Sequence, residues 1–179
     1  MVLPIVAYGD PVLRKVGIEI DKEYPNLKEL IENMKDTMKN ARGVGLAAPQ
    51  IGKAIRLFLV EEQNFLKKFK KVFINAKITS EEGNEWAFGE GCLSIPNINE
   101  DVFRNEKLTI EYVDENFKKH TEVLEGLAAR VVQHEYDHIE GILFTDKLSS
   151  LKKRLLKKKL NNISKGNIDV EYRMRFPKK

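Results

Sequence analysis

A pair of histidines flanking a glutamate is the strongest chemical signal in this sequence. His134, Glu135 and His138 form an H-E-x-x-H motif, and the chain has only three histidines. Positions four apart share one face of a helix, so both imidazoles can meet one metal ion. Glu135 can reach a water on that metal and carry its proton. The spacing therefore favours a metal-dependent hydrolase over a chance pair of surface histidines.

The third metal ligand must come from another part of the chain, because a catalytic metal usually takes three protein ligands. Downstream candidates are weak: no histidine follows His138, Glu140 lies too close on the same helix, and Glu171 belongs to a basic tail. The other candidate is Cys92, the only cysteine. A lone cysteine is more often a small buried residue than a ligand. However, Cys92 is predicted to lie in a small-residue loop between strands, where the glycines beside it permit close backbone approach, and this favours Cys92.

Three segments together resemble the peptide deformylase family: residues 43–50 (GVGLAAPQ), 90–94 (EGCLS) and 133–138 (QHEYDH). They occur in the family's order and at similar separations. Residues 10–14 and 141–146 are also similar, so the resemblance covers nearly the whole chain up to about residue 151. The three-part combination is much more specific than H-E-x-x-H alone.

The resemblance implies a role for each motif residue. Cys92, His134 and His138 would bind the metal, Glu135 would act as acid and base, and Gln50 and the Leu93 backbone N–H would form an oxyanion hole. A metal lowers the pKa of its bound water toward ~7, so a metal-bound hydroxide is expected to attack the formyl carbon. Donors fixed around the resulting oxyanion contribute ~2.7–4 kcal/mol each. Glu135 would pass the proton to the leaving nitrogen, yielding formate and a free N-terminal methionine.

The resemblance also implies a substrate groove, in which the backbone around Gly45 pairs with an extended peptide. The expected contacts are Gly43, Val44, Gly45, Phe88, Gly91, Leu127, Arg130, Val131 and the His134 ring, with the Arg130 stem at the edge of a methionine slot. Plain core packing is the alternative for each apolar member. Many family members carry a basic residue within the stretch that matches residues 96–101, and this chain has none there. That departure argues against a charged contact from Asn97, Ile98 or Asn99 to the substrate backbone.

Metal-bound histidines are usually oriented by a further layer of hydrogen bonds. Glu90 and Asp137 are the candidates here, and Arg104 is expected to pair with Asp137. One thiolate and two imidazoles suit Zn²⁺ and also Fe²⁺, Co²⁺ or Ni²⁺. By resemblance, Fe²⁺ is the expected native ion, with Zn²⁺ a common and less active occupant.

Helices and strands must position these residues. Helices are predicted over residues 26–41, 124–139 and 148–161, with Asn26 as an N-cap and Gly43 and Gly141 as stops. Strands are predicted at residues 55–60, within 71–78, at 107–113 and around 118–123. Residues 43–52, rich in glycine, predict a shaped loop. Grouped strands predict an α+β fold, with antiparallel or mixed sheets packed around the metal-binding helix.

The end of the chain is strongly basic. Residues 147–179 contain 12 basic and 2 acidic residues, a balance of +10, whereas residues 1–146 contain 19 and 25, a balance of −6. The C-terminal helix is predicted to pack on the core through one stripe: Leu148, Leu151, Leu155, Leu156 and Leu160. By resemblance, its lysines would contact ribosomal RNA phosphates. A solvated amphipathic helix is the alternative.

Composition indicates one globular domain spanning residues 1–179, with 42% hydrophobic and 32% charged residues. No apolar run approaches the ~20 residues of a membrane-spanning helix, and no secretory signal is expected. A single cysteine cannot form an intramolecular disulfide, as expected in a reducing cytosol. Together with a formylated substrate, these features predict the bacterial cytoplasm.

Two other functions compete with this interpretation. A metalloprotease of the same broad class would need a downstream ligand, and none there is convincing. A non-catalytic metal-binding or RNA-binding module would explain the basic tail. Such a module would not require Glu135, Gln50 and a glycine-rich loop together, and a Glu135→Gln substitution would leave its function unchanged.

Overall fold

The computed structural model describes residues 1–62 and 69–177. Its main sheet is antiparallel, with the strand order β2-β3-β4-β5-β6. These strands are β2 (Gly45–Ala47), β3 (Leu57–Glu62), β4 (Phe69–Cys92), β5 (Ile95–Val113) and β6 (Lys119–Glu125). A second, parallel sheet pairs β1 (Ile5–Val6) with β7 (Met174–Arg175). Sheets and helices in this arrangement confirm the α+β prediction.

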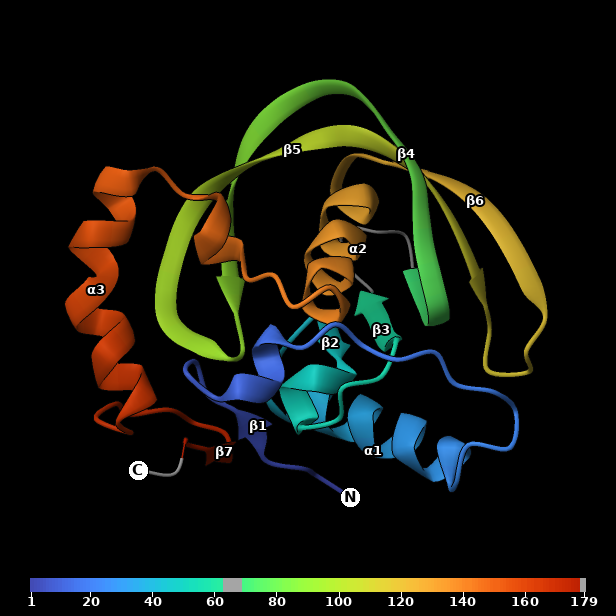
Figure 1. Cartoon of the computed structure of the whole chain (residues 1–179), viewed down its shortest axis with the longest axis horizontal. Coiled ribbons are helices and arrows are strands. Elements are labelled where there is room, and N and C mark those ends of the chain that lie inside the picture. The colour runs from blue at the N-terminus through green and yellow to red at the C-terminus, as the bar shows by residue number, and fades with distance from the viewer. Residues whose placement is uncertain (63–68, 178–179) are drawn as a thin grey trace.

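The two long strands β4 and β5 arch over the central helix α2 (Figure 1). Their pairing is interrupted by four register shifts, and such irregularities bend a strand. The sequence predicted only short strands within residues 71–78 and 107–113, because each shift breaks the alternation of apolar and polar residues. It also placed Cys92 in a loop. Instead, Cys92 is the last residue of β4 and pairs with Ile95 across a tight turn.

Helix α2 (Gly126–Ile139) carries the metal motif through the centre of the molecule. The prediction that it starts at residue 124 was wrong by two residues, because Leu124 and Glu125 pair with β5 as the end of β6. Gly126 makes the junction with a left-handed φ of 61°. The predicted stop is correct: Gly141 is left-handed at φ 72°, and the Ile142 N–H donates to the Asp137 carbonyl at 2.9 Å.

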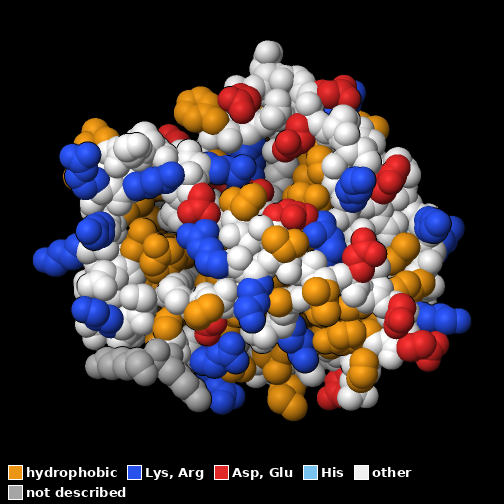
Figure 2. Space-filling model, in the orientation of Figure 1, with side chains coloured by type: hydrophobic (Ala, Val, Ile, Leu, Met, Phe, Trp, Pro, Cys, Tyr) orange, Lys and Arg blue, Asp and Glu red, His pale blue; other side chains and the backbone are white. Residues whose placement is uncertain are grey.

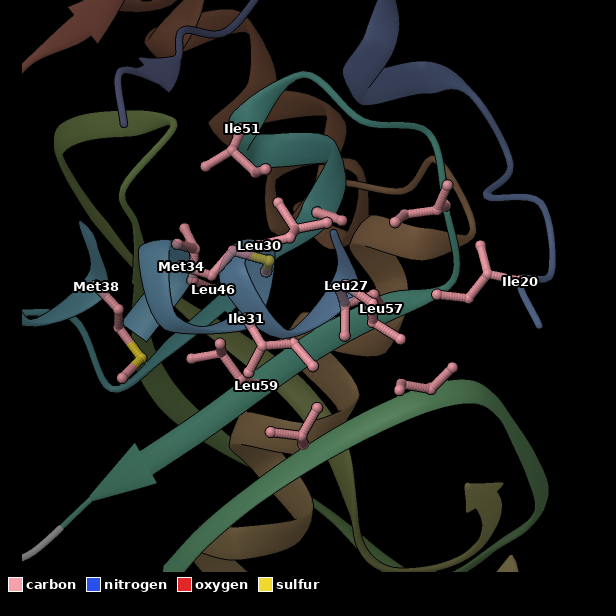
Figure 3. Close-up of a cluster of buried hydrophobic side chains, with 14 of the residues drawn as sticks. Ile20, Leu27, Leu30, Ile31, Met34, Met38, Leu46, Ile51, Leu57 and Leu59 are labelled. Atoms are coloured by element: carbon pink, nitrogen blue, oxygen red, sulfur yellow. The ribbon is translucent and has the colours of Figure 1, made fainter. Parts of the chain in front are cut away.

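Helix α1 (Leu27–Asn40) packs its apolar face against β2 and β3 (Figure 3). Asn26 occupies the N-cap position but is left-handed at φ 55° and makes no side-chain cap hydrogen bond, so its predicted capping role was wrong. Gly43 was also misassigned. The left-handed residue after the helix is Arg42 at φ 55°, and Gly43 follows it, with its N–H donating to the Met38 carbonyl at 2.9 Å.

Residues 43–52 are more regular than the shaped loop that was predicted. They contain β2 and then a 3-10 helix, η2 (Ala48–Ile51), which ends at the left-handed Gly52. Two further 3-10 helices are η1 (Pro11–Arg14) and η3 (Phe144–Lys147). Across residues 1–62 and 69–177, no helix is long and apolar enough to cross a membrane.

Helix α3 (Ser150–Ser164) lies at the edge of the molecule (Figure 1). Its start is capped by Ser149, whose hydroxyl accepts from the Lys152 N–H at 3.3 Å. The predicted leucine stripe was partly wrong. Leu148, Leu156 and Leu160 are buried, but Leu151 and Leu155 are 63% and 71% exposed. A helix at the edge of the molecule contacts the rest of the protein along a narrow strip of its surface, so leucines beside that strip remain exposed to solvent.

Candidate metal centre

Helix α2 presents both histidines of the motif toward one point. His134 and His138 lie one turn apart, with ring centroids 5.2 Å from each other. Cys92 arrives from the end of β4, and its Sγ lies 3.3 Å from Nε2 of His138. Ligand atoms of all three residues lie within 4.8 Å of one another. The sequence therefore identified three side chains that the fold brings together.

This donor set fits a transition metal. Nδ1 of His134 is hydrogen-bonded to Glu90 at 3.0 Å, which leaves its Nε2 free for a metal. Burial lowers the pKa of His138, so its imidazole is neutral, which is the form that binds metals. One cysteine sulfur and two imidazole nitrogens form a soft, three-ligand set, and a catalytic metal held by three protein ligands keeps a fourth position open.

Glu135 is buried beside these ligands, with only 4% of its surface exposed. Its Oε2 has no hydrogen-bond partner within the described part of the chain. Burial raises the pKa of Glu135 to about 7, a value suited to exchanging protons near neutral pH. The carboxyl lies against Gly45, where any Cβ would collide with it. A side chain at this position of β2 would have to displace the Glu135 carboxyl, and glycine leaves that space open.

Gln50 is held in η2 with its amide nitrogen toward the metal ligands. Its Oε1 accepts from the Ala47 N–H at 2.9 Å, which fixes the amide orientation. Nε2 then lies 3.5 Å from the Sγ of Cys92 and 3.3 Å from the Oγ of Ser94. A neutral amide donor in this buried position could stabilise negative charge on a nearby oxygen.

A buried charge network surrounds Glu90. Its carboxylate accepts from Arg104 at 2.7 and 3.0 Å and from Arg130 at 2.7 Å, in addition to His134. Burial alone would raise the pKa of Glu90, but His134 and Arg104 outweigh it and hold this pKa well below its usual range. Arg104 also donates to Asp137 at 2.8 Å, the pairing that the sequence predicted. Asp137 is therefore linked to the ligand His134 by a chain of hydrogen bonds through Arg104 and Glu90.

Cys92, His134 and Glu135 line a cleft of about 990 Å³. All the residues expected to contact substrate line it: Gly43, Val44, Gly45, Phe88, Gly91, Leu127, Arg130, Val131 and His134. Arg130 lines the cleft, but its charged end does not face the cleft. Its guanidinium is turned inward to Glu90 and lies 4.3 Å from the centre of the Trp86 ring. The part of the cleft wall formed by Arg130 therefore carries a buried guanidinium whose charge is compensated by Glu90.

Sequence reasoning missed one wall of the cleft. Residues 169–172, beyond α3, line it together with residues 40–42 and Asn97. The only available signal was an aromatic residue, Tyr172, within a basic tail. The third histidine, His120, is not part of the cleft lining, and its Nε2 is hydrogen-bonded to Oδ2 of Asp114 at 2.8 Å.

Comparison with known proteins gives one consistent result. Residues 2–154 match the family model described as polypeptide deformylase. The chain is 64% identical to the peptide deformylase of Christiangramia forsetii, over 99% of this chain and 97% of that one. It is 61% identical to that of Flavobacterium johnsoniae, over 98% and 96%. Its fold is similar to the peptide deformylase structure from Thermus thermophilus, with a TM-score of 0.85, 42% identity and coverage of 93% and 99%.

Proposed function

The chain belongs to the polypeptide deformylase family of metal-dependent hydrolases, and we propose that it removes the N-terminal formyl group from formyl-methionyl polypeptides as they are synthesised. The observation that carries this proposal is the meeting of Cys92, His134 and His138 beside a buried Glu135. The products would be formate and a free methionine amino group. We place the whole reaction in one catalytic domain, residues 1–179.

The metal would be held by the Cys92 thiolate and by Nε2 of each histidine. When bound, a divalent ion supplies a Lewis acid that polarises the formyl carbonyl and acidifies a water. We propose Fe²⁺ as the native ion. The same donors also accept Zn²⁺, Ni²⁺ or Co²⁺, which purified protein could contain.

Glu135 would carry the proton during hydrolysis. Its unpartnered Oε2 takes the proton that the attacking water gives up, and it returns that proton to the methionine nitrogen as the amide breaks. Glu135 is one residue from the ligand His134, so the attacking water and the methionine nitrogen would both lie close to its carboxyl. A buried carboxyl at this position therefore suits the transfer of one proton between them. The lack of a side chain at Gly45 leaves room for the carboxyl in this position.

Gln50 and the Leu93 N–H would stabilise the oxyanion that forms on the formyl oxygen. Gln50 is suited to this because Ala47 fixes its amide orientation. Leu93 directly follows the ligand Cys92, so its N–H would lie near the formyl group of a bound substrate. Preorganised donors of this kind lower the barrier without adding a charge.

The methionine side chain would enter the apolar part of the cleft formed by Phe88, Leu127 and Val131. Phe88 is 44% exposed, which suits a side chain that becomes covered only when substrate binds. The extended peptide would run along Gly43, Val44 and Gly45 on one side and Gly91 on the other. Because the Arg130 guanidinium is paired with the buried Glu90, we expect no charged contact from Arg130 to the substrate.

The basic helix α3 would bring the enzyme to its substrate at the ribosome in the bacterial cytoplasm. Basic side chains line the edge of the molecule where α3 lies (Figure 2). Phosphate contacts predict binding that weakens steeply as salt rises. Co-sedimentation with ribosomes at two salt concentrations tests this contact separately from catalysis.

Formate release from formyl-Met-Ala-Ser, by protein purified anaerobically with Fe²⁺, tests the proposed reaction. Acetyl-Met-Ala-Ser is the matched control, since it differs only at the acyl group. We expect rapid release from the formyl peptide and very slow hydrolysis of the acetyl peptide. Equal cleavage of both, or cleavage of internal peptide bonds, would instead indicate a general metallopeptidase.

A further inference from the structure

The C-terminal segment after α3 returns to the catalytic cleft. It runs from the end of α3 to β7, which pairs with β1 (Figure 1). On the way, residues 169–172 form part of the cleft wall. This segment lies beyond residue 154, where the match to the family model ends. The match to the family model therefore does not account for the contacts of this segment with the cleft.

Contacts at several points fix the segment in place. The Ile5 N–H donates to the Arg173 carbonyl and the Ala7 N–H to the Arg175 carbonyl, both at 2.9 Å. Nearer the cleft, the Asn97 side chain donates to the Asp169 carbonyl at 3.2 Å. The segment is thus held on both sides of Tyr172.

Tyr172 makes the contact closest to the chemistry. Its hydroxyl donates to the Leu93 carbonyl oxygen at 2.8 Å. Burial, and then the nearby Cys92, raise the pKa of Tyr172 above its usual range, so the phenol remains a donor at neutral pH. The ring packs against the core cluster that also contacts Leu93. Tyr172 therefore has a fixed position from which to hold the turn.

The turn between Cys92 and Ser94 has few other constraints on Leu93. Gln50 contacts Cys92 and Ser94, and the Tyr8 N–H donates to the Ser94 carbonyl at 2.8 Å. These bonds hold the two neighbours of Leu93. The Leu93 N–H and the Leu93 carbonyl belong to consecutive planar peptide groups that meet at the Leu93 Cα, with only φ and ψ of Leu93 between them. With Cys92 and Ser94 held on either side, fixing the carbonyl restricts these two rotations and therefore the direction of the N–H.

We propose that Tyr172 is a positioning residue, which aims the Leu93 N–H at the formyl oxygen by anchoring the Leu93 carbonyl from the C-terminal segment. This inference rests on the proposed deformylase function. A donor aligned before the reaction stabilises the transition state more than the bound substrate. Loss of the anchor should therefore lower kcat and leave KM nearly unchanged.

The test compares Tyr172→Phe with Tyr24→Phe. Both tyrosines pack against the same core cluster, but Tyr24 does not line the cleft. With formyl-Met-Ala-Ser, we expect kcat of Tyr172→Phe to fall about 3- to 10-fold, the range of one hydrogen bond, with KM within about twofold. Tyr24→Phe should keep the wild-type kcat.

A second measurement does not depend on activity or on a bound metal. In the metal-free protein, the NMR amide signals of Cys92, Leu93 and Ser94 should shift in Tyr172→Phe and stay in place in Tyr24→Phe. Unchanged signals, or a kcat per folded molecule equal to wild type, would overturn the proposal. A wild-type protein that releases no formate would refute the proposed function, while the amide signals would still report whether the anchor exists.

Discussion

Glu90 and His134 are joined by a hydrogen bond of 3.0 Å between Oε2 and Nδ1, and the same carboxylate binds two buried arginines. Glu90→Gln should therefore act on the metal and on the fold together. We expect metal affinity to fall about 10- to 100-fold, because His134 loses its orienting acceptor. The unfolding free energy should fall by about 3–5 kcal/mol, because Arg104 and Arg130 lose a buried countercharge.

Chelator competition with Zn²⁺ and urea unfolding measure these two effects of Glu90→Gln. Asp137→Asn is the matched comparison, since Asp137 contacts Arg104 without contacting His134. Its effect on metal affinity should be smaller. If Asp137→Asn keeps full metal content and activity, Asp137 has no part in orienting the ligands.

Gly45→Ala should lower activity without removing the metal. A Cβ at residue 45 would displace the Glu135 carboxyl, whereas the three ligands lie elsewhere. We expect kcat to fall at least about tenfold, since general acid–base catalysis contributes about 10²–10⁴-fold. Gly91→Ala is the comparison, because a Cβ there would meet only ordinary contacts at 3.6 and 3.7 Å. A loss of activity in Gly45→Ala no greater than in Gly91→Ala would contradict this account.

Adjacent leucines on α3 should differ sharply in their contribution to stability. Leu156 is 6% exposed and Leu155 is 71% exposed. Leu156→Ala should lower the unfolding free energy by about 2–5 kcal/mol, as for other buried leucines. Leu155→Ala should change it by no more than about 0.5 kcal/mol. Urea unfolding of the pair checks this, and equal losses would mean that α3 is packed through a different face.

Stability should depend on pH through Glu122. Burial alone would raise the pKa of Glu122, but hydrogen bonds from Lys71 and Tyr112 lower it. A pKa lowered by folding stabilises the protein above the unfolded value of about 4.3, and this contribution is lost as pH falls. The deficit of Glu122→Gln relative to wild type should thus be largest at pH 7 and shrink toward pH 3.5.

Urea unfolding across this pH range measures the effect, and Lys71→Met should show a similar pH dependence. Lys71 lies 2.5 Å from the Glu122 carboxylate, so removing either partner breaks the same pair. A deficit that stays constant with pH would show that Glu122 does not titrate differently in the folded protein.

Local spacing made the centre of this site predictable. His134, Glu135 and His138 belong to one helix, so their geometry follows from helical periodicity alone. Cys92 lies 42 residues before His134 in the sequence, and it was identified from its glycine neighbours and from family resemblance. Its place at the end of β4, however, depends on bulges that the apolar pattern does not reveal.

Long-range contacts explain what the sequence could not predict. Tyr172 reaches Leu93 only because β7 pairs with β1, and two-residue strands leave no periodic pattern. Leu151 and Leu155 fit an apolar stripe, but their spacing does not indicate how much of the surface of an edge helix contacts the rest of the protein. In both cases the outcome depends on packing between distant segments.

Metal titration of the metal-free protein tests the central claim most directly. Fe²⁺ is added anaerobically in steps, and formate release from formyl-Met-Ala-Ser is measured for wild type and Glu135→Gln. We predict that wild-type activity rises until one metal ion is bound per chain. Glu135→Gln should bind the same amount but release formate at least about 10²-fold more slowly. Wild-type protein that binds one metal ion and releases no formate, or a Glu135→Gln variant as fast as wild type, would contradict this account.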